Sequence, residues 1–480
     1  MSENGADPET AGPWAVPSTW VWTEMGAIAD VAGGGTPSTK DTANYDGGEI
    51  AWITPADLSG YTQKYIQRGS RNITSKGLRG SSARLLPSGT VLFSSRAPIG
   101  YVAIASRPVS TNQGFKNFVL NSGVQPDYAY YYLKRAKDLI TQLGAGTTFK
   151  EVSGAKAARV PCPLPPLPEQ HRIVAEIEKH FTRLDASVAA LQRARANLKR
   201  YRAAVLQAAC EGRLNAVHEP QKKGDLPPGW RLAAVRDIGR VQLGRQRSPK
   251  NRSSKYPTKY IRAANITWNG LDLGDVLDMD FGPRELENYR LLPGDVVIAE
   301  ASGSADQVGK PAIWKGELQD CCFQNTVIRL RPNGTVTSGF ALVMFSHYAR
   351  NGTFSAASSG VGIHHLSAAR FGSLPFPLPP LAQQKTIVAE VERRLSVVGS
   401  LEAATNNARQ RAGRLRQAIL KLAFEGRLVA QDPNDEPASV LLDRIRAERA
   451  ARGDRRAIRR SSRRAEAAAA QMRLEEARPE

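Results

Sequence analysis

Apolar residues recur at intervals of seven over two long stretches of the chain, which is the spacing of helices that pair along a narrow apolar seam. The first stretch opens with Pro168 and an acidic residue, both of which suit a first helical turn. Its seam positions are held by Val174, Ile177, Phe181, Leu184, Val188, Leu191 and Leu198. We therefore predict a coiled-coil helix over residues 166–214, with Gly212 as its stop.

The second stretch covers residues 379–428 and has a weaker, Ala-rich middle. Its seam positions are held by Val388, Val391, Leu395, Val398, Leu415 and Ile419. Each helix would be roughly 65 Å long, and neither can bury its apolar stripe on itself. We expect the two helices to pair antiparallel as a coiled coil. Packing of each helix on its own globular region is the alternative.

The regions before the helices, residues 18–165 and 228–378, alternate short β-rich runs with Gly and Pro turns. The runs include TVLFSS and YVAIAS in the first region, and DVVIAE and NTVIRLR in the second. A helix-like segment follows in each region, Tyr128–Leu143 and Phe340–Asn351. Both regions are predicted to be α+β domains. Residues 1–17 are predicted to be disordered, and residues 215–227 to form a linker.

The order domain, helix, domain, helix is a duplication. Of the 19 residues from Pro161 to Lys179, 12 are identical to those from Pro375 to Arg393, at an offset of 214. EGRL closes both helices at the same offset, and Thr111–Phe115 loosely matches Cys322–Thr326. The helices match better than the domains, so we predict one pseudo-two-fold symmetric frame that carries two divergent domains. The prolines of PLPPL before each helix are expected to deny further sheet pairing.

The charge of the chain indicates the class of partner. Lys and Arg number 66 against 45 Asp and Glu, which gives a net charge of +21 and a pI of about 10.0. Such an excess is typical of proteins that bind a polyanion, nucleic acid first. No apolar run is long enough for a membrane span, and the acidic N-terminus does not resemble a signal peptide. We expect a cytoplasmic protein without a membrane partner.

Loops of both regions hold residue types that contact DNA, because Arg pairs with guanine, Asn and Gln pair with adenine, and Lys mostly meets phosphate. Candidates in the first region are Thr36, Ser38, Thr39, Lys40, Thr54, Arg96, Asn112, Gln113 and Lys116. Candidates in the second are Arg245, Arg247, Lys250, Arg252, Lys255, Lys259, Arg262, Asn265, Gln324 and Asn325. A solvated surface charge is the simpler interpretation of one basic residue, whereas the cluster favours DNA.

Motifs for catalysis and for metal binding are missing from the sequence. Gly303–Pro311 fails as a phosphate loop, because proline stands where Ser or Thr would bind magnesium. Asp295 and Glu300 are not followed by a lysine at nuclease spacing, and the adjacent pair His364–His365 lacks zinc spacing. We therefore predict no catalytic residue, no metal site and no cofactor on this chain.

Several of these motifs together resemble one known family. PLPPL…Q…IVAE at each helix start, EGRL at each helix end, and Gln431–Arg449 are similar to the specificity subunit of type I restriction–modification enzymes. GGTPST followed by WITPADL is similar to the target-recognition domains of that family. The resemblance covers about Ser18 to Arg449, and the helix starts are specific only as a pair.

The resemblance implies a non-catalytic subunit that binds double-stranded DNA. Two tandem target-recognition domains would each read one half of a bipartite site. The paired helices would set the spacer and dock two copies of the modification subunit, an adenine methyltransferase that carries S-adenosylmethionine. Restriction subunits, which translocate and cleave DNA with ATP and magnesium, would join that core.

Two other functions stay open. A self-sufficient DNA methyltransferase or nuclease with an unrecognised active site would bind S-adenosylmethionine or cleave DNA by itself. A structural coiled-coil protein would bind DNA without sequence preference. The C-terminal segment, residues 429–480, is expected to be a basic and partly helical tail, either a solvated helix or an arm that binds phosphates.

Overall fold

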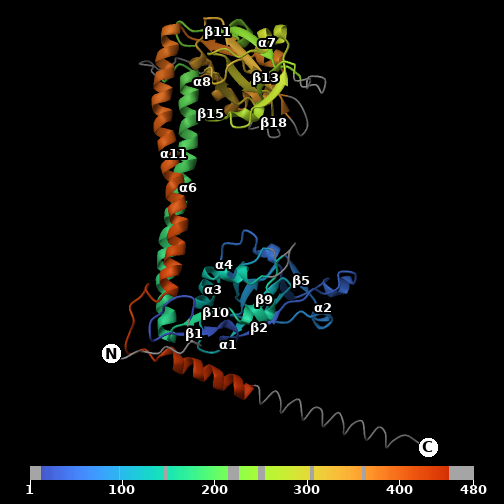
Figure 1. Cartoon of the computed structure of the whole chain (residues 1–480), viewed down its shortest axis with the longest axis vertical. Coiled ribbons are helices and arrows are strands. Elements are labelled where there is room, and N and C mark those ends of the chain that lie inside the picture. The colour runs from blue at the N-terminus through green and yellow to red at the C-terminus, as the bar shows by residue number, and fades with distance from the viewer. Residues whose placement is uncertain are drawn as a thin grey trace, which may run out of the picture. The chain divides into compact units, whose positions relative to one another are not determined.

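Figure 1 shows the computed structural model of the chain, which describes residues 12–96, 98–144, 150–214, 226–246, 255–302, 308–358 and 364–452. The chain divides into two compact units, residues 1–188 with 410–480 and residues 189–409. Each unit holds one globular domain and a part of each long helix. The predicted disorder of residues 1–17 falls mostly outside the described residues.

The first domain is built on two sheets with the strand orders β2-β9-β6-β7-β4 and β5-β3-β8. The strands of the larger sheet are β2 (Ala29–Gly33), β9 (Phe115–Leu120), β6 (Val91–Ser94), β7 (Val102–Ala105) and β4 (Tyr65–Ile66). Those of the smaller sheet are β5 (Arg71–Ile73), β3 (Ile50–Ile53) and β8 (Ser110–Thr111). Pairing is antiparallel except between β4 and β7 and between β3 and β8.

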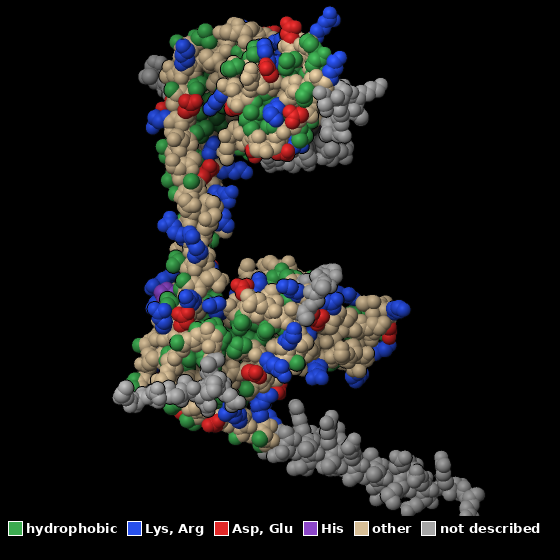
Figure 2. Space-filling model, viewed as in Figure 1, with side chains coloured by type: hydrophobic (Ala, Val, Ile, Leu, Met, Phe, Trp, Pro, Cys, Tyr) green, Lys and Arg blue, Asp and Glu red, His purple; other side chains and the backbone are tan. Residues whose placement is uncertain are grey.

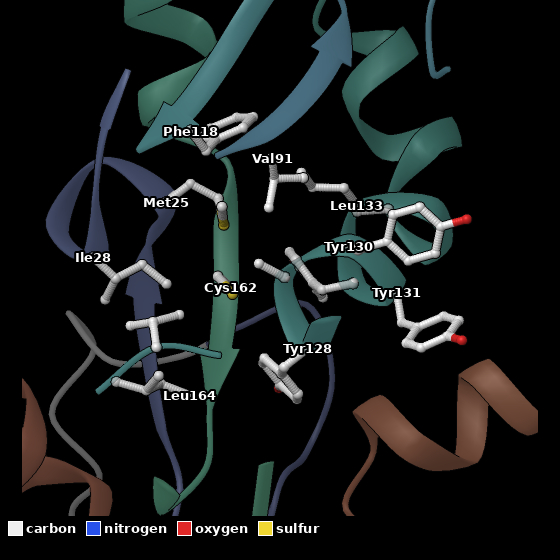
Figure 3. Packing of buried hydrophobic residues seen from close by; sticks show 14 of the residues in the cluster. Met25, Ile28, Val91, Phe118, Tyr128, Tyr130, Tyr131, Leu133, Cys162 and Leu164 are labelled. Carbon is white, nitrogen blue, oxygen red and sulfur yellow. The ribbon is translucent and has the colours of Figure 1, made fainter. Parts of the chain in front are cut away.

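The core of this domain lies between the larger sheet and helix α3 (Pro126–Arg135), which packs on β6 and β7. Figure 3 shows Val91 and Phe118 of the sheet with the tyrosines of α3 and with Met25 and Ile28 of α1 (Met25–Ile28). The buried hydroxyl of Tyr128 donates to the Pro163 carbonyl at 2.6 Å. This bond ties α3 to the strand that leads into the first long helix.

The second domain repeats this architecture. Its larger sheet has the order β12-β21-β17-β19, and its smaller sheet the order β16-β13-β20 with β13 and β20 parallel. The strands are β12 (Gly239–Leu243), β21 (Val327–Pro332), β17 (Val296–Ala299), β19 (Pro311–Ile313), β16 (Leu277–Asp280), β13 (Pro257–Ile261) and β20 (Cys322–Phe323). Helix α8 (Ser338–Asn351) packs on β17 and β19 as α3 packs on β6 and β7. The predicted pair of α+β domains is confirmed.

Strand pairing fixes how the two copies align. Ile53 of β3 pairs with Thr111 of β8, and Ile261 of β13 pairs with Phe323 of β20. Thr111 therefore corresponds to Phe323, and the sequence-based match of Thr111 with Cys322 is wrong by one residue. Too few residues are identical in this region to align the two copies by sequence. The strand pairing gives each residue one partner and therefore fixes the alignment.

The proline-rich strip before each helix begins as a strand. β1 (Val21–Glu24) pairs antiparallel with β10 (Pro161–Leu164), and β11 (Arg231–Ala234) pairs with β23 (Pro375–Leu378). Prolines occupy every second position of β10 and β23, so the residues between them can still donate to the ladder. Sheet pairing thus runs two residues into PLPPL and stops at the consecutive prolines.

The two long helices, α6 (Leu167–Cys210) and α11 (Leu381–Phe424), have 44 residues each. Within the first unit Arg416 forms an ion pair with Asp185, and within the second unit Arg202 lies 2.8 Å from Glu402. Residue numbers therefore rise along one helix as they fall along the other. The predicted antiparallel pairing is confirmed, and Figure 1 shows the helices side by side.

The predicted seam residues are buried or half-buried with one exception among those described. Leu415 is 51% exposed, and its neighbour Arg416 faces the seam instead. The guanidinium of Arg416 lies 5.0 Å from the centre of the Phe181 ring and pairs with Asp185. Counting by sevens from Val388 and Leu395 gives position 416, so Arg416 holds the seam position and Leu415 lies one residue off the repeat. Leu415 is corrected to a surface residue of the chain.

The C-terminal segment packs on the first domain. Residues 438–452 are helical, and their apolar side chains join the core cluster of that domain: Leu441, Leu442 and Ile445. Arg449 donates to the main-chain carbonyls of Ala27 and Ala29 at 3.2 and 3.3 Å. The expected partly helical tail is thus a packed part of the first unit up to residue 452. Residues 453–480 lie outside the described part of the chain.

Candidate nucleic-acid interface

Loops that are far apart in the sequence meet at one edge of the sheets in each domain, here called the loop edge. In the first domain it consists of the turns after β2, β3, β6 and β8 and the segment before α5 (Gly154–Ala158). In the second domain it consists of the turns after β12, β13, β17 and β20 and the segment before α10 (Ala368–Ser373). Most of the predicted DNA contacts lie on these turns.

The same main-chain hydrogen bonds join the loop edge in both domains. In the first domain the N–H groups of Gly35, Asn112, Ser95 and Val152 donate to the carbonyls of Thr111, Ile53, Gly114 and Ser95 at 2.9, 3.0, 2.8 and 2.9 Å. In the second domain those of Arg245, Gln324, Glu300 and Leu366 donate to Phe323, Ile261, Thr326 and Glu300 at 3.0, 2.9, 2.8 and 2.9 Å. Because backbone groups make the joins, the side chains on them can differ without loss of the frame.

Most candidates of the first domain extend into solvent. The exposed ones are Thr36, Ser38, Thr39, Lys40, Arg96 and Gln113. The side chains of Thr36 and Gln113 hydrogen-bond to each other although they are 77 residues apart. Lys and Arg side chains also spread over the visible face of this domain (Figure 2). The fold thereby gathers hydroxyl, amide and basic groups on one edge, which is the mixture that contacts phosphates and base edges.

Three candidates of the first domain instead make hydrogen bonds or ion pairs with neighbouring residues of the loop edge. The Thr54 hydroxyl donates to Asp57 at 2.8 Å, and Asn112 accepts from its own turn. The Lys116 ammonium, 13% exposed, lies 3.4 Å from a carboxylate oxygen of Glu151. Their contact with DNA stays a prediction.

In the basic cluster of the second domain, the two arginines that the structure describes are paired with acids. Arg245 lies 2.8 Å from Glu285, and its guanidinium covers the Phe281 ring at 5.0 Å. Arg262 forms an ion pair with Asp275. These ion pairs offset the positive charge of the two arginines. Sequence reasoning missed the acids because Asp275 lies in the loop before β16 and Glu285 lies in α7 (Pro283–Tyr289).

Two lysines of the cluster, Lys255 and Lys259, are exposed. Lys259 lies 3.6 Å from Asp278, and the Lys255 ammonium lies 5.4 Å from the centre of the Tyr256 ring. Contacts at such exposed sites are weak and leave both lysines available to phosphates. The other predicted basic contacts fall outside the described residues: Arg247, Lys250 and Arg252.

Asn265 has a structural role that the sequence did not reveal. Its side chain is 3% exposed and accepts from the Arg262 N–H at 2.9 Å. Its amide nitrogen donates to the carbonyls of Asp272 and Asp275 at 2.9 and 3.0 Å. Asp57 holds the corresponding turn of the first domain. Since each hydrogen-bonding group of this buried amide is used within its loop, Asn265 is corrected from a DNA contact to a turn-forming residue.

Gln324 and Asn325 stand at the loop edge where the corrected alignment puts Asn112 and Gln113 of the first domain. Both are half-buried. The Gln324 side-chain oxygen lies 3.5 Å from the Thr326 hydroxyl, which is a weak contact. Three acidic or imidazole side chains at the loop edge were not among the predicted DNA contacts: Glu151, Glu300 and His365.

Each domain is fixed to its long helix by a buried glutamine near the helix start. Gln170 in α6 and Gln384 in α11 hydrogen-bond to the loop before the domain helix and to the proline strip. The end of each helix is also alike, since Gly212 and Gly426 have φ of 69° and 68°. Both ends satisfy their last carbonyls with a glycine turn.

Metal sites, membrane-spanning helices and disulfides are absent from the described part of the chain. No group of three or more His, Cys, Asp or Glu has an arrangement that could hold a metal ion there. No helix among the described residues is long and apolar enough to span a membrane. The four cysteines are buried and form no disulfide, and burial raises the pKa of each thiol.

Comparisons with known proteins agree with this architecture. The TM-score is 0.53 against the HsdS subunit from Thermoanaerobacter tengcongensis, at 22% identity over 87% of this chain and 99% of that chain. It is 0.67 against a chain from a structure on complex assembly of the type I R-M system, at 22% identity over 86% and 100% of the two chains. At this level of identity these likenesses support the fold alone.

Curated relatives share more of the sequence. The type I restriction enzyme MjaIX specificity subunit of Methanocaldococcus jannaschii is 36% identical over 243 residues, which are 48% of this chain and 54% of that protein. The EcoKI specificity subunit of Escherichia coli (strain K12) is 27% identical over 339 residues, 68% and 72% of the two chains. The chain thus spans about half the length of the first relative and nearly three quarters of the second.

A family model supplies the assignment. The type I restriction modification DNA specificity domain matches twice, at residues 17–192 and 227–407. Each match covers one domain and a part of the long helix that follows it, in agreement with the duplication. Because the two matches together cover well over half of its length, the chain belongs to the type I restriction–modification DNA specificity family.

Proposed function

We propose that this chain is the non-catalytic subunit that reads DNA for a type I restriction–modification complex, with each domain reading one half of a bipartite site. The observation that carries the proposal is the loop edge, whose main-chain bonds are the same in both domains while its side chains differ. One frame with two sets of side chains is what reading two different half-sites requires. The net charge of +21 supports a DNA partner.

The paired helices would set the unread spacer and dock two modification subunits. Each helix runs for 44 residues without a break, and each is clamped to a domain by a buried glutamine. A continuous helix is stiff on this scale, so its length is a suitable measure of distance along DNA. The duplication supports two copies of the modification subunit, because it provides two equivalent docking faces.

The chemistry would reside on the partner subunits in the cytoplasm. S-adenosylmethionine would be bound by the modification subunits, and ATP and magnesium by the restriction subunits. The sequence supports this division, because Gly303–Pro311 fails as a phosphate loop, and Asp295 and Glu300 lack the lysine of a nuclease site. The purified chain is accordingly expected to bind no S-adenosylmethionine and to cleave no DNA; either activity would favour the alternative of a self-sufficient enzyme.

Domain exchange tests the modular reading of DNA. Residues 18–165 are replaced by the corresponding domain of another member of the family, and the variant is expressed with its modification subunits. Methylome sequencing is expected to show that one half-site has changed, with the other half-site and the spacer kept. A change in both halves would contradict separate reading by the two domains. Methylation without any bipartite motif in the parent protein would contradict the proposed function itself.

A further inference from the structure

The loop edge of the second domain carries an acid and an imidazole that face each other. Glu300 follows β17 directly, and its side chain is 12% exposed. The Nδ1 atom of His365 lies 3.2 Å from both carboxylate oxygens of Glu300. The His365 side chain is 53% exposed, so the pair borders solvent. An acid that borders solvent at the edge of a basic protein is unusual if that edge meets phosphates.

The first domain also has an acid with a basic partner at its loop edge, but at different positions. The Val152 N–H donates to the Ser95 carbonyl in the first domain, and the Leu366 N–H donates to the Glu300 carbonyl in the second. Ser95 therefore corresponds to Glu300. The same bonds also show that Glu151 stands where His365 stands. The acid of the first domain is therefore Glu151, in the segment before α5, and its basic partner is Lys116 of β9, at 3.4 Å.

These side-chain pairs are not needed to join the two loops. The main-chain bonds of 2.9 Å already connect them in both domains. In addition, Arg96 and Glu151 form a β-bridge in the first domain, and Ala301 pairs with His365 in the second. Because the backbone makes this join, the side chains at the loop edge can differ between the domains, and the acid stands at a different position in each, Glu300 and Glu151.

On DNA, a carboxylate has few places where it is stabilised. Phosphates repel it, and the base edges of the major groove offer one kind of donor, the exocyclic amino groups of cytosine N4 and adenine N6. An acid on a DNA-reading edge therefore selects for a base that carries such an amino group. His365 and Lys116 would hold each carboxylate in place until the base arrives.

We propose that Glu300, positioned by His365, determines specificity in the second domain by accepting a hydrogen bond from the amino group of a cytosine or an adenine. Glu151, positioned by Lys116, has the equivalent role in the first domain. The proposal rests on the proposed function, because it assumes that the loop edges read DNA. It assigns one base pair of each half-site to a named acid.

The test measures discrimination at each position of the site. The full chain, assembled with its modification subunits, is assayed on duplexes that carry every single base-pair change in the methylome-derived site. In Glu300→Gln and Glu300→Ala, discrimination at one position of one half-site is expected to fall by about tenfold or more, since one good base contact is worth about 1–3 kcal/mol. Glu151→Gln should do the same in the other half-site, and His365→Gln should weaken discrimination at the same position as Glu300.

Glu317→Gln is the matched control, because this exposed acid of the second domain precedes β20 and only caps the Lys315 N–H, at 2.8 Å. It should leave all positions unchanged. Discrimination within about twofold of the parent at every position, in folded Glu300 and Glu151 variants, overturns the proposal. If the Glu300 variants do not assemble, the same criterion applied to His365→Gln and Glu151→Gln decides. Absence of a bipartite site in the parent complex would instead count against the proposed function.

Discussion

Gln170 and Gln384, 214 residues apart, make the same set of hydrogen bonds in the two units. The amide oxygen of each accepts one main-chain N–H, from Gln125 at 2.9 Å and from Thr337 at 2.7 Å. The amide nitrogens donate to the carbonyls of Gly123 and Pro165, and of Thr335 and Pro379, at 2.9–3.2 Å. Each buried glutamine thus links the helix start, the proline strip and the loop before the domain helix. This clamp explains why the strip recurs with a glutamine at a fixed place.

Loss of the clamp is expected to destabilise one unit at a time. Gln170→Ala leaves main-chain groups in the first unit without partners and should lower its free energy of unfolding by about 2–3 kcal/mol. Hydrogen exchange of the α3 and β10 amides measures the effect in that unit, and Gln384→Ala should act in the same way on the second. The exposed Gln207→Ala is the control and should change stability by less than about 0.5 kcal/mol. Equal exchange rates in Gln170→Ala and the parent would contradict the clamp.

Glycine at the end of a long helix is expected to be irreplaceable, unlike glycine inside it. A Cβ atom on Gly426 would lie 2.3 Å from Pro17, and the residue has a φ of 68°. Gly426→Ala should therefore destabilise the first unit by more than about 1 kcal/mol. Gly413 lies inside α11 with open space around it, so Gly413→Ala should stabilise the chain by about 1 kcal/mol. Thermal unfolding of both variants decides, and a gain in stability for Gly426→Ala would contradict the glycine turn.

The acid beside Gln170 makes the first unit sensitive to pH. Burial raises the pKa of Glu169, although hydrogen bonds from Trp20 at 2.9 Å and Gln431 at 2.6 Å oppose the shift. A raised pKa in the folded state means that the stabilising contribution is present below the ordinary glutamate pKa, about 4.3, and is lost as pH rises through the folded value. The free energy of unfolding of the first unit should fall over that window, and Glu169→Gln should remove the fall.

The second unit provides a natural control for this prediction. Gln383 occupies the place of Glu169 and accepts from Trp230 at 2.9 Å. No titratable group stands there, so the second unit should not show the same change over the same window. Denaturant unfolding with probes in each unit, at several pH values from about 4 upward, measures both. A pH dependence that Glu169→Gln leaves intact would assign it to another group.

Exposed apolar residues on α11 are expected to serve assembly rather than the stability of this chain. Val397 and Leu401 are 54% and 48% exposed and lie one turn apart, whereas Val398 is fully buried in the seam. Val397→Ser with Leu401→Ser should leave thermal unfolding of the purified chain unchanged and weaken binding of the modification subunit. Val398→Ser should lower the unfolding temperature. Co-purification and the Kd of the complex measure assembly. Normal assembly of the double variant would contradict docking on this face.

The sequence was sufficient to predict features that depend on spacing. The offset of 214, the seven-residue repeat and the turn residues predicted two α+β domains and two antiparallel helices, because each of these patterns is local or repeats along the chain. The pattern was less informative where packing decides. Leu415 is apolar but lies one residue off the repeat and faces solvent, whereas Arg416, which is in register with Val388 and Leu395, covers Phe181.

Candidate DNA contacts were predicted by residue type, which says nothing about their partners. Arg245 and Arg262 are matched by Glu285 and Asp275, and Asn265 is consumed by its own turn. The acids lie in α7 and in the loop before β16, and one sequence does not show which segments lie against the two arginines.

The sequence by itself determined that this chain is a duplicated protein of the type I specificity family, since the motifs that mark the family lie at helix starts and ends, where short stretches carry their own signals. Only the tertiary structure decided which loops form the loop edge. It also decided that Glu300 and His365 correspond to Ser95 and Glu151 of the first domain. The reason is physical: hydrogen bonds between main-chain groups make the loop edge, and main-chain groups are the same for almost every residue, so they leave no trace in the sequence.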